Sequence, residues 1–230
     1  MSTNPRGPVS RRERPAKPAL SREGIVATAV AVMRAEGLEK VTMRRLAQEL
    51  DTGAASLYVY VANMAELHAA VLDQLLGEVE LEPSGETWRD RLAGVLASYT
   101  DVLLQHPALA RAAISVRPAG ENYLHLVERI LALLLEGGAS RVQAAWGVDL
   151  LLQLATASAA EHSTRLQSGS SEAEWDALTH TVREAPGETY PNLHALAGEL
   201  LSGSPQARFD WFFGVLVTGI LRTPSDPRSS

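Results

Sequence analysis

Apolar side chains recur at helical spacing along most of the chain, and short polar segments separate one run from the next. Ser21 is placed to cap the first predicted helix, and Gly37 is placed to end it. Thr42 is placed to cap a second helix, residues 51–53 predict a turn, and residues 54–60 predict a third helix. Two helices joined by so short a turn are typical of a helix-turn-helix unit.

The rest of the chain continues in the same helical period. Asn63 and Glu66 form a capping pattern for a helix from Met64 to about Val79. Residues 167–191 are rich in Ser, Gly, Glu and Thr, which predicts a mobile segment. Further helices are predicted from residue 86 to about 103, from 107 until residues 117–120 end it, over 123–134, over 140–165, over 192–201, and from 205 to about 222. No strand is predicted, and the fold class is therefore all-α.

Composition narrows the class of protein. The chain of 230 residues has no Cys, which excludes disulfides and thiolate zinc sites. It lacks the run of about 18 apolar residues that a membrane-spanning helix requires, and its N-terminus lacks the apolar core of a signal peptide. We therefore expect a cytoplasmic protein without a membrane partner.

The charge is distributed unevenly, although the net charge is -6. Residues 1–64 contain ten Lys and Arg against six Asp and Glu, a balance of +4, whereas residues 65–230 contain eleven against twenty-one, a balance of -10. Within the positive part, residues 1–19 carry four Pro, five basic residues and one acidic residue, which predicts a flexible basic arm. Nucleic acid responds to the local charge of a face, so the acidic total does not exclude a DNA partner.

Motifs of common enzymes are absent. The sequence has no P-loop, no nucleophile elbow and no Gly-rich dinucleotide fingerprint. Its six His do not show metal-binding spacing, and Glu161 and His162 are adjacent, so they do not share a helical face. We therefore predict no catalytic residue, no cofactor and no metal ion.

Residues 20–67, LSREGIVATAVAVMRAEGLEKVTMRRLAQELDTGAASLYVYVANMAEL, resemble the DNA-binding domain of the TetR family of transcriptional repressors. A weaker resemblance links residues 85–118 and the segment RFDWFFGVLVTGI to the ligand domain of tetracycline-repressor-like members. Two departures stand out. The turn begins with Asp51 where the family has Gly, and the Lys-Asn-Lys at the start of the fourth helix is Ala62-Asn63-Met64 here. Asp tolerates the left-handed conformation, so we expect the turn to survive, whereas two phosphate contacts are in doubt.

The resemblance implies an Ω-shaped, all-helical homodimer in which a small molecule bound to the larger domain releases DNA. The implied organisation is a flexible arm over residues 1–19, a helix-turn-helix domain over 20–66, a ligand-binding and dimerisation domain over 67–224, and a flexible tail over 225–230. The two subunits are expected to meet through the long helix 140–165 and the last helix 205–222.

The third helix is expected to read bases in the major groove. Ala54 and Ala55 suit thymine methyls, Ser56 suits either partner of a base pair, and Tyr58 and Tyr60 suit phosphates. The alternative places Leu57, Tyr58 and Val61 in the core, which we favour for Leu57 and Val61, whereas we favour DNA contact for Ser56 and Tyr60. The full set of expected DNA contacts is Thr42, Arg44, Arg45, Ala54, Ala55, Ser56, Tyr58, Val59, Tyr60 and, from the arm, Arg11, Arg12, Arg14 and Lys17. A solvated tail is an equally favoured role for the arm.

A largely apolar effector is expected. Where the tetracycline repressor has its metal-binding His, a following Thr and an Asn for the drug, this chain has Ala113, Val116 and Val95, although it keeps an acid at Glu161, so tetracycline with magnesium is not favoured. The expected lining is Leu92, Val95, Leu96, Tyr99, Ile114, Val116, Leu131, Trp146 and Gln153. Each of these residues, taken singly, is more typical of plain core. The alternative function is a helical small-molecule-binding protein or co-regulator without autonomous DNA binding, and an all-helical enzyme is a distant third.

Overall fold

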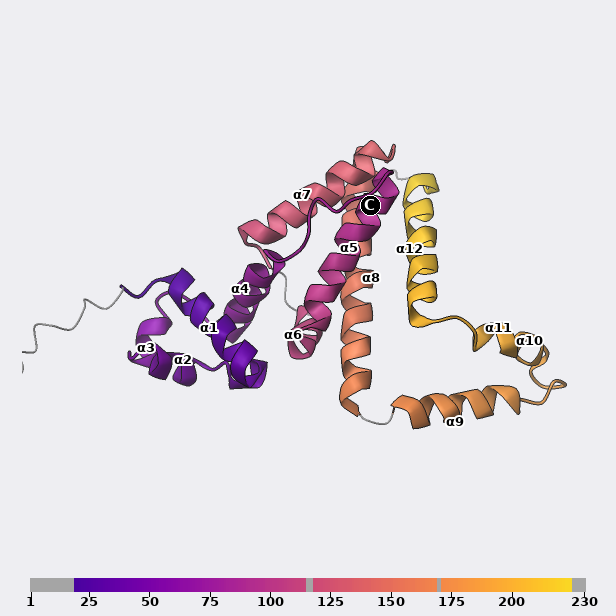
Figure 1. The fold of residues 1–230 in the computed structure, drawn as a ribbon, viewed down its shortest axis with the longest axis horizontal. Coiled ribbons are helices and arrows are strands. Elements are labelled where there is room, and N and C mark those ends of the chain that lie inside the picture. Colours follow the sequence, from indigo (N-terminus) through magenta and orange to yellow (C-terminus); the bar gives the residue numbers. More distant parts are fainter. Residues whose placement is uncertain (1–18, 115–117, 169–170, 225–230) are drawn as a thin grey trace, which may run out of the picture.

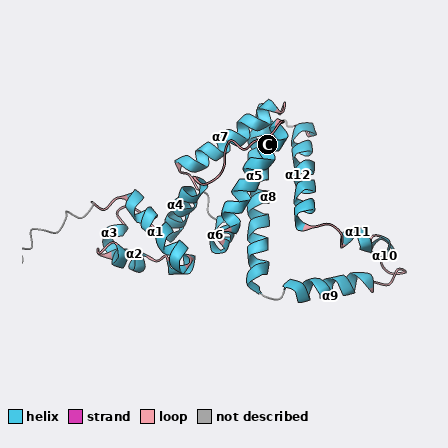
Figure 2. Cartoon of the chain, in the orientation of Figure 1, coloured by secondary structure: helices cyan, strands magenta, loops and turns pink. Residues whose placement is uncertain are grey.

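The computed structural model describes residues 19–114, 118–168 and 171–224, and within these stretches it contains helices and no strand (Figures 1 and 2). The N-terminal unit comprises α1 (Arg22–Glu36), a short 3₁₀ helix η2 (Leu38–Lys40), α2 (Met43–Glu49) and α3 (Ala54–Leu57). The predicted all-α class is thus confirmed.

Local capping explains why the N-terminal helices begin where they do. The hydroxyl of Ser21 accepts a hydrogen bond from the amide of Gly24 at 3.1 Å, and the hydroxyl of Thr42 accepts one from the amide of Arg45 at 3.1 Å. Asp51 adopts a φ of 48°, the left-handed conformation that ends α2 and turns the chain toward α3. The departure from Gly at this position therefore leaves the turn intact.

The fourth helix, α4 (Met64–Leu76), connects the N-terminal unit to the rest of the chain. The side chain of Asn63 accepts a hydrogen bond from the amide of Glu66 at 2.9 Å, and the Glu66 carboxylate accepts one from the amide of Ala62 at 2.8 Å. This is the expected capping pattern, shifted by one residue on the Glu side. The helix packs against α1 on one side, and on the other against α5 (Trp88–Leu104), α6 (Pro107–Ala113) and α7 (Glu121–Glu136).

The larger unit is built around one long helix. α8 (Arg141–Ser168) packs against α5 (Trp88–Leu104), α6 (Pro107–Ala113), α7 (Glu121–Glu136) and α12 (Pro205–Arg222). Because it has partners on several sides, its apolar residues cover more than one face, as its sequence predicts. The chain between α8 and α12 forms α9 (Ser171–Arg183), α10 (Pro191–Ala195) and α11 (Ala197–Leu200), which extend away from the body in Figure 1.

Four sequence predictions differ from the structure. The helix expected from Met64 to about Val79 ends at Leu76. The third helix ends at Leu57 instead of residue 60, and residues 58–60 continue as a turn in which the Val61 amide donates to the Leu57 carbonyl at 3.1 Å. The segment 167–191, for which the sequence predicts no helix, contains α9 over Ser171–Arg183. The single helix expected over residues 192–201 is two short helices that bend at Leu196.

Candidate DNA-reading and effector sites

The helix-turn-helix separates core side chains from outward-facing ones within one short segment. Leu57 and Val61 have no exposed surface, which confirms their predicted core role. The side chain of Val59 is 81% exposed, and Tyr58 and Tyr60 are also exposed. Ala55 and Ser56 are exposed, and Ala54 is half-buried. The outward face of α3 and its following turn is thus mostly apolar and aromatic, with one hydroxyl at Ser56 and two phenols.

Arg44 and Arg45 have different surroundings although they are neighbours on α2. The Arg45 guanidinium binds the carboxylates of Glu36 at 2.7 Å and Glu49 at 2.5 Å. These two hydrogen-bonded carboxylates raise the pKa of Arg45 and bind it to the protein surface. Arg44 is exposed and has no ion-pair partner among the described residues. The geometry therefore favours Arg44, and not Arg45, as the phosphate contact in the first turn of α2.

The expected arm contacts, Arg11, Arg12, Arg14 and Lys17, lie outside the described residues. The structure thus places the predicted DNA contacts Thr42, Arg44, Ala55, Ser56, Tyr58, Val59 and Tyr60 on accessible parts of the helix-turn-helix. Thr42 serves mainly as the cap of α2, so its hydroxyl is already engaged with the Arg45 amide.

The interior of the larger unit contains a buried polar pair. Tyr99 on α5 is 6% exposed, and its hydroxyl lies 2.7 Å from the hydroxyl of Thr156 on α8. Burial raises the pKa of Tyr99, and the hydrogen bond with Thr156 partly opposes that shift. Sequence reasoning missed Thr156, because a single Thr within a helix carries no signal of its role until its partner is known. On the same helix as Tyr99, Leu92, Val95 and Leu96 are buried, and Leu131 on α7 is half-buried.

Three residues expected to line the effector site do not join this group. Ile114, at the end of α6, is 68% exposed, and Trp146 on α8 is 59% exposed. Gln153 is exposed and donates a hydrogen bond to Asp149 one turn earlier at 2.7 Å. The helical pattern could not assign these faces, because apolar residues occur all round α8 and its partners are distant in sequence. Val116 lies outside the described residues.

Trp146 instead lines a small cleft between α8 and α12, of about 120 Å³, together with Leu150 and Ile220. More than two turns earlier on α12, the rings of Trp211 and Phe212 lie 5.5 Å apart and are exposed, and Val215 is exposed as well. Large apolar side chains left outward on two packed helices are typical of a surface that another chain covers. These are the two helices that the sequence predicts at the subunit interface.

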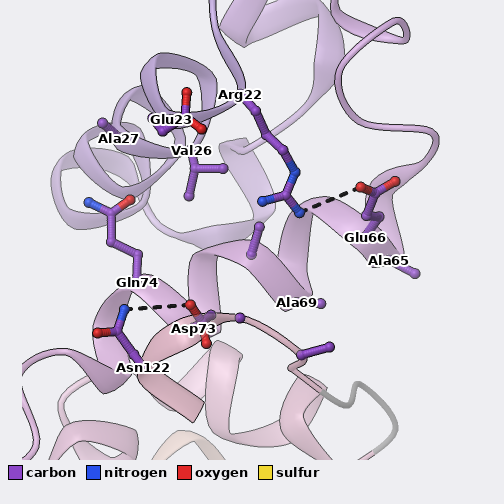
Figure 3. A pocket seen from close by; sticks show the side chains of 13 residues that line it. Arg22, Glu23, Val26, Ala27, Ala65, Glu66, Ala69, Asp73, Gln74 and Asn122 are labelled. Carbon is purple, nitrogen blue, oxygen red and sulfur yellow. Dashed lines mark hydrogen bonds and ion pairs between the residues drawn. The ribbon is translucent and has the colours of Figure 1, made fainter. Parts of the chain in front are cut away.

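A second concave region lies where the helix-turn-helix unit meets the larger unit. It is an open groove of about 850 Å³ whose lining side chains come from α1, α4 and the start of α7 (Figure 3). Small residues, including Ala27, Ala65 and Ala69, form much of its surface, and Arg22 binds Glu66 across it at 3.5 Å. At its far end, Asp73 lies beside Asn122.

The described residues contain no group of three or more His, Asp or Glu arranged to hold a metal ion. The carboxylate of Glu161 binds Arg165 one turn later on α8 at 2.6 Å. None of the described helices is both long enough and apolar enough to cross a membrane.

Solved structures share this architecture. The transcription regulator SCO7704 from Streptomyces coelicolor is 59% identical, with a TM-score of 0.79 that covers 93% of this chain and 100% of that one. ActR from the same organism, in complex with actinorhodin, is 38% identical, with a TM-score of 0.77 that covers 91% of this chain and 99% of that one. A curated relative, the HTH-type transcriptional regulator of Saccharopolyspora erythraea, is 34% identical over 90% of this chain and 87% of its own length.

Both parts of the sequence match family descriptions. Residues 25–71 match the bacterial regulatory proteins of the tetR family, and residues 82–223 match the tetracyclin repressor-like C-terminal domain. The first match contains the helix-turn-helix, and the second contains the buried Tyr99–Thr156 pair and the apolar surface of α8 and α12. The chain belongs to the TetR family, and it is a DNA-binding transcriptional regulator that acts as a dimer.

Proposed function

We propose that this regulator represses transcription by binding a near-palindromic operator, and that a small, largely apolar molecule releases it. The proposal of operator binding rests on the separation of buried from exposed side chains within residues 56–61. Leu57 and Val61 lie in the core, so Ser56, Tyr58 and Tyr60 are left exposed, and Arg44 on α2 is exposed without an ion-pair partner among the described residues. Ser56 is the only side chain of α3 that can hydrogen-bond a base, and Arg44 with the phenols supplies phosphate contacts.

The two α3 helices of a dimer would enter successive major grooves about 34–36 Å apart. The dimer is proposed to close through α8 and α12, because these helices carry the exposed Trp146, Leu150, Trp211 and Phe212. A four-helix contact of this kind would leave both N-terminal units on the same side, as a two-fold operator requires.

The effector is proposed to be a flat, mostly apolar molecule with one or two polar groups. Support comes from the buried face of α5, since Leu92, Val95 and Leu96 are apolar and Tyr99 with Thr156 supplies two hydroxyls on that face. A polar group of the effector would exchange with that pair and keep both hydroxyls satisfied. The relative ActR has been solved with actinorhodin and with (S)-DNPA, so actinorhodin is a practical first probe.

A binding module that has lost DNA recognition is the second candidate. It is favoured by the sequestered Arg45 and by an α3 without Lys, Arg, Asn or Gln. In the first candidate function, operator binding, the basic arm compensates for the few DNA-contacting side chains of α2 and α3, because its five Lys and Arg can add phosphate contacts. We propose no enzymatic activity in either case.

The deciding experiment is selection of bound genomic fragments by the purified protein at about 50 mM and about 200 mM salt, where phosphate-driven binding differs steeply. We expect one palindromic sequence to be recovered, and deletion of residues 1–19 to weaken its binding. Added actinorhodin should release the fragment, whereas tetracycline with magnesium should not. A folded dimer that recovers no specific sequence at either salt would support the second candidate.

A further inference from the structure

Helix α7 begins without a capping side chain of its own. Its N-cap residue is Gly120, so the first-turn amides lack the local acceptor that Ser, Thr, Asn or Asp supplies at other helices. The carboxylate of Asp73, from α4, takes this place. Its Oδ1 accepts a hydrogen bond from the amide of Tyr123 at 2.9 Å, and its Oδ2 lies 3.5 Å from the Asn122 side-chain nitrogen (Figure 3).

The identity of residue 120 makes this contact possible. A β-carbon added at Gly120 would lie 2.0 Å from Oδ2 of Asp73, so any larger residue would displace the carboxylate. The backbone at Gly120, with φ of -89° and ψ of -178°, is one that every residue adopts. Glycine is therefore needed here for space and not for conformation, and an exchange at this position acts through Asp73.

The N-terminal unit of α1, η2, α2 and α3 is called the DNA-reading unit below. Helix α4 contacts this unit along its length. Arg22 at the start of α1 pairs with Glu66 at the start of α4, and Arg34 near the end of α1 pairs with Glu78 just beyond α4. Between these pairs, Leu67, Val71 and Leu75 of α4 are fully buried. A helix fixed at both ends and packed between them moves with its partner. Asp73 thus links the DNA-reading unit to a helix of the larger unit.

We propose that the Asp73 cap fixes the angle between α4 and α7 and thereby limits the spread of spacings between the two DNA-reading units of the dimer. Hydrogen bonds weaken steeply when their direction changes, whereas the burial of apolar surface has no preferred direction. A tilt of α4 that keeps its apolar surface buried would therefore still break the hydrogen bonds that Asp73 makes to the start of α7. Asp73 is in this sense a positioning residue. Its role rests on the proposed function, in which the two DNA-reading units of the dimer bind one operator together.

The test measures the distance between the two DNA-reading units directly, without operator or effector. Because the chain has no Cys, Gln48→Cys on the exposed side of α2 gives one spin-label site in each subunit, and pulsed electron resonance reports the distance distribution. In an Asp73→Ala background we expect a broader distribution than in the parent. The same distribution in both would overturn the proposal. Since neither DNA nor effector is present, this outcome is independent of the fragment selection.

Two further variants separate positioning from plain helix stabilisation. Asp90→Ala removes a cap that lies wholly within the larger unit, where Asp90 and Thr87 form the capping box of α5. It should destabilise the chain and leave the distance distribution unchanged. Asp73→Ala with Gly120→Ser gives α7 its own cap without the link to α4. It should restore slow amide exchange at Tyr123, which Asp73→Ala accelerates about tenfold as expected for a lost helix cap, but should keep the broad distribution. Recovery of the narrow distribution by Gly120→Ser would show that the cap only stabilises α7.

Discussion

The hydroxyl groups of Tyr99 and Thr156 lie 2.7 Å apart in a mostly apolar interior, and they join α5 to α8. Each hydroxyl is the other's partner, so the pair is satisfied only when both are present. If the proposed effector binds at this pair, it must replace each hydrogen bond that it breaks.

Removing one hydroxyl of the Tyr99–Thr156 pair should lower the free energy of unfolding by more than half of what removing both hydroxyls does. Tyr99→Phe or Thr156→Val leaves a buried hydroxyl without its partner, and we expect each to lower the free energy of unfolding by about 1–2 kcal/mol. The double variant leaves no orphan, so its loss should be smaller than the sum of the two. Urea denaturation at fixed dimer concentration measures this cycle, and strict additivity would show that the hydroxyls are independent.

Alkaline pH should destabilise the protein through the same tyrosine. Burial raises the pKa of Tyr99 in the folded state, so the folded protein holds its proton more tightly than the unfolded chain does. The stabilisation is fully present below the unfolded pKa of about 10 and is lost as pH rises through the folded pKa. We expect the melting temperature of the parent to fall more steeply above about pH 10 than that of Tyr99→Phe. Parallel curves would contradict this assignment.

Arg44 and Arg45 form a matched pair of neighbours for testing DNA contact. Arg44→Ala should weaken binding to operator and to unrelated DNA alike, and should reduce the slope of log affinity against log salt by about 1. Arg45→Ala should leave that slope unchanged, since Glu36 and Glu49 already engage its guanidinium. Fluorescence anisotropy titrations over a salt series provide the measurement. A larger slope change for Arg45→Ala would reverse the assignment.

Ser56 should govern sequence preference instead of overall affinity. We expect Ser56→Ala to relax preference at one base pair in each half-site and to leave the salt slope as in the parent, because a hydroxyl contributes no charge. A competition assay with operators varied at each position would locate that base pair. Equal weakening at every position would point to a lost phosphate contact.

Trp211 offers a test of the dimer surface. It is exposed beside Phe212 on α12, and a carboxylate placed there would be desolvated when the partner covers the helix. Trp211→Glu should therefore shift the protein toward monomer in sedimentation velocity experiments while its helical circular dichroism remains. Trp175→Glu on α9 is the control, since Trp175 is also exposed but lies outside α8 and α12. A dimer unaffected by Trp211→Glu would move the interface elsewhere.

Local physical signals made much of the N-terminal unit predictable. Ser21, Thr42 and Asn63 cap the helices that their positions indicate, and Asp51 makes the left-handed turn. In each case the interacting atoms are within a few residues, so sequence spacing contains the geometry. The early end of α3 at Leu57 was not predictable in this way, since apolar spacing continues to Val61.

The contacts that define the candidate sites join residues that are distant in sequence. Asp73 caps a helix that begins 48 residues later, and Thr156 meets Tyr99 across 57 residues. Nothing in either neighbourhood signals the partner. The missed α9 is a different case, because Trp175, Leu178 and Val182 recur at helical spacing, and only the Ser- and Glu-rich surroundings obscured them.

The two ion pairs that join α1 to α4 have a consequence for protein engineering. Arg22 and Arg34 are separated by the same number of residues as Glu66 and Glu78, so the two helices run side by side in matched register. The segment from α1 through Glu78 therefore contains both partners of each ion pair, and it keeps these contacts when it is moved into another protein. Transplanted onto another sensor domain of this family, it would need a glycine opposite Asp73 and apolar surfaces that match α4 in place of α5, α6 and α7.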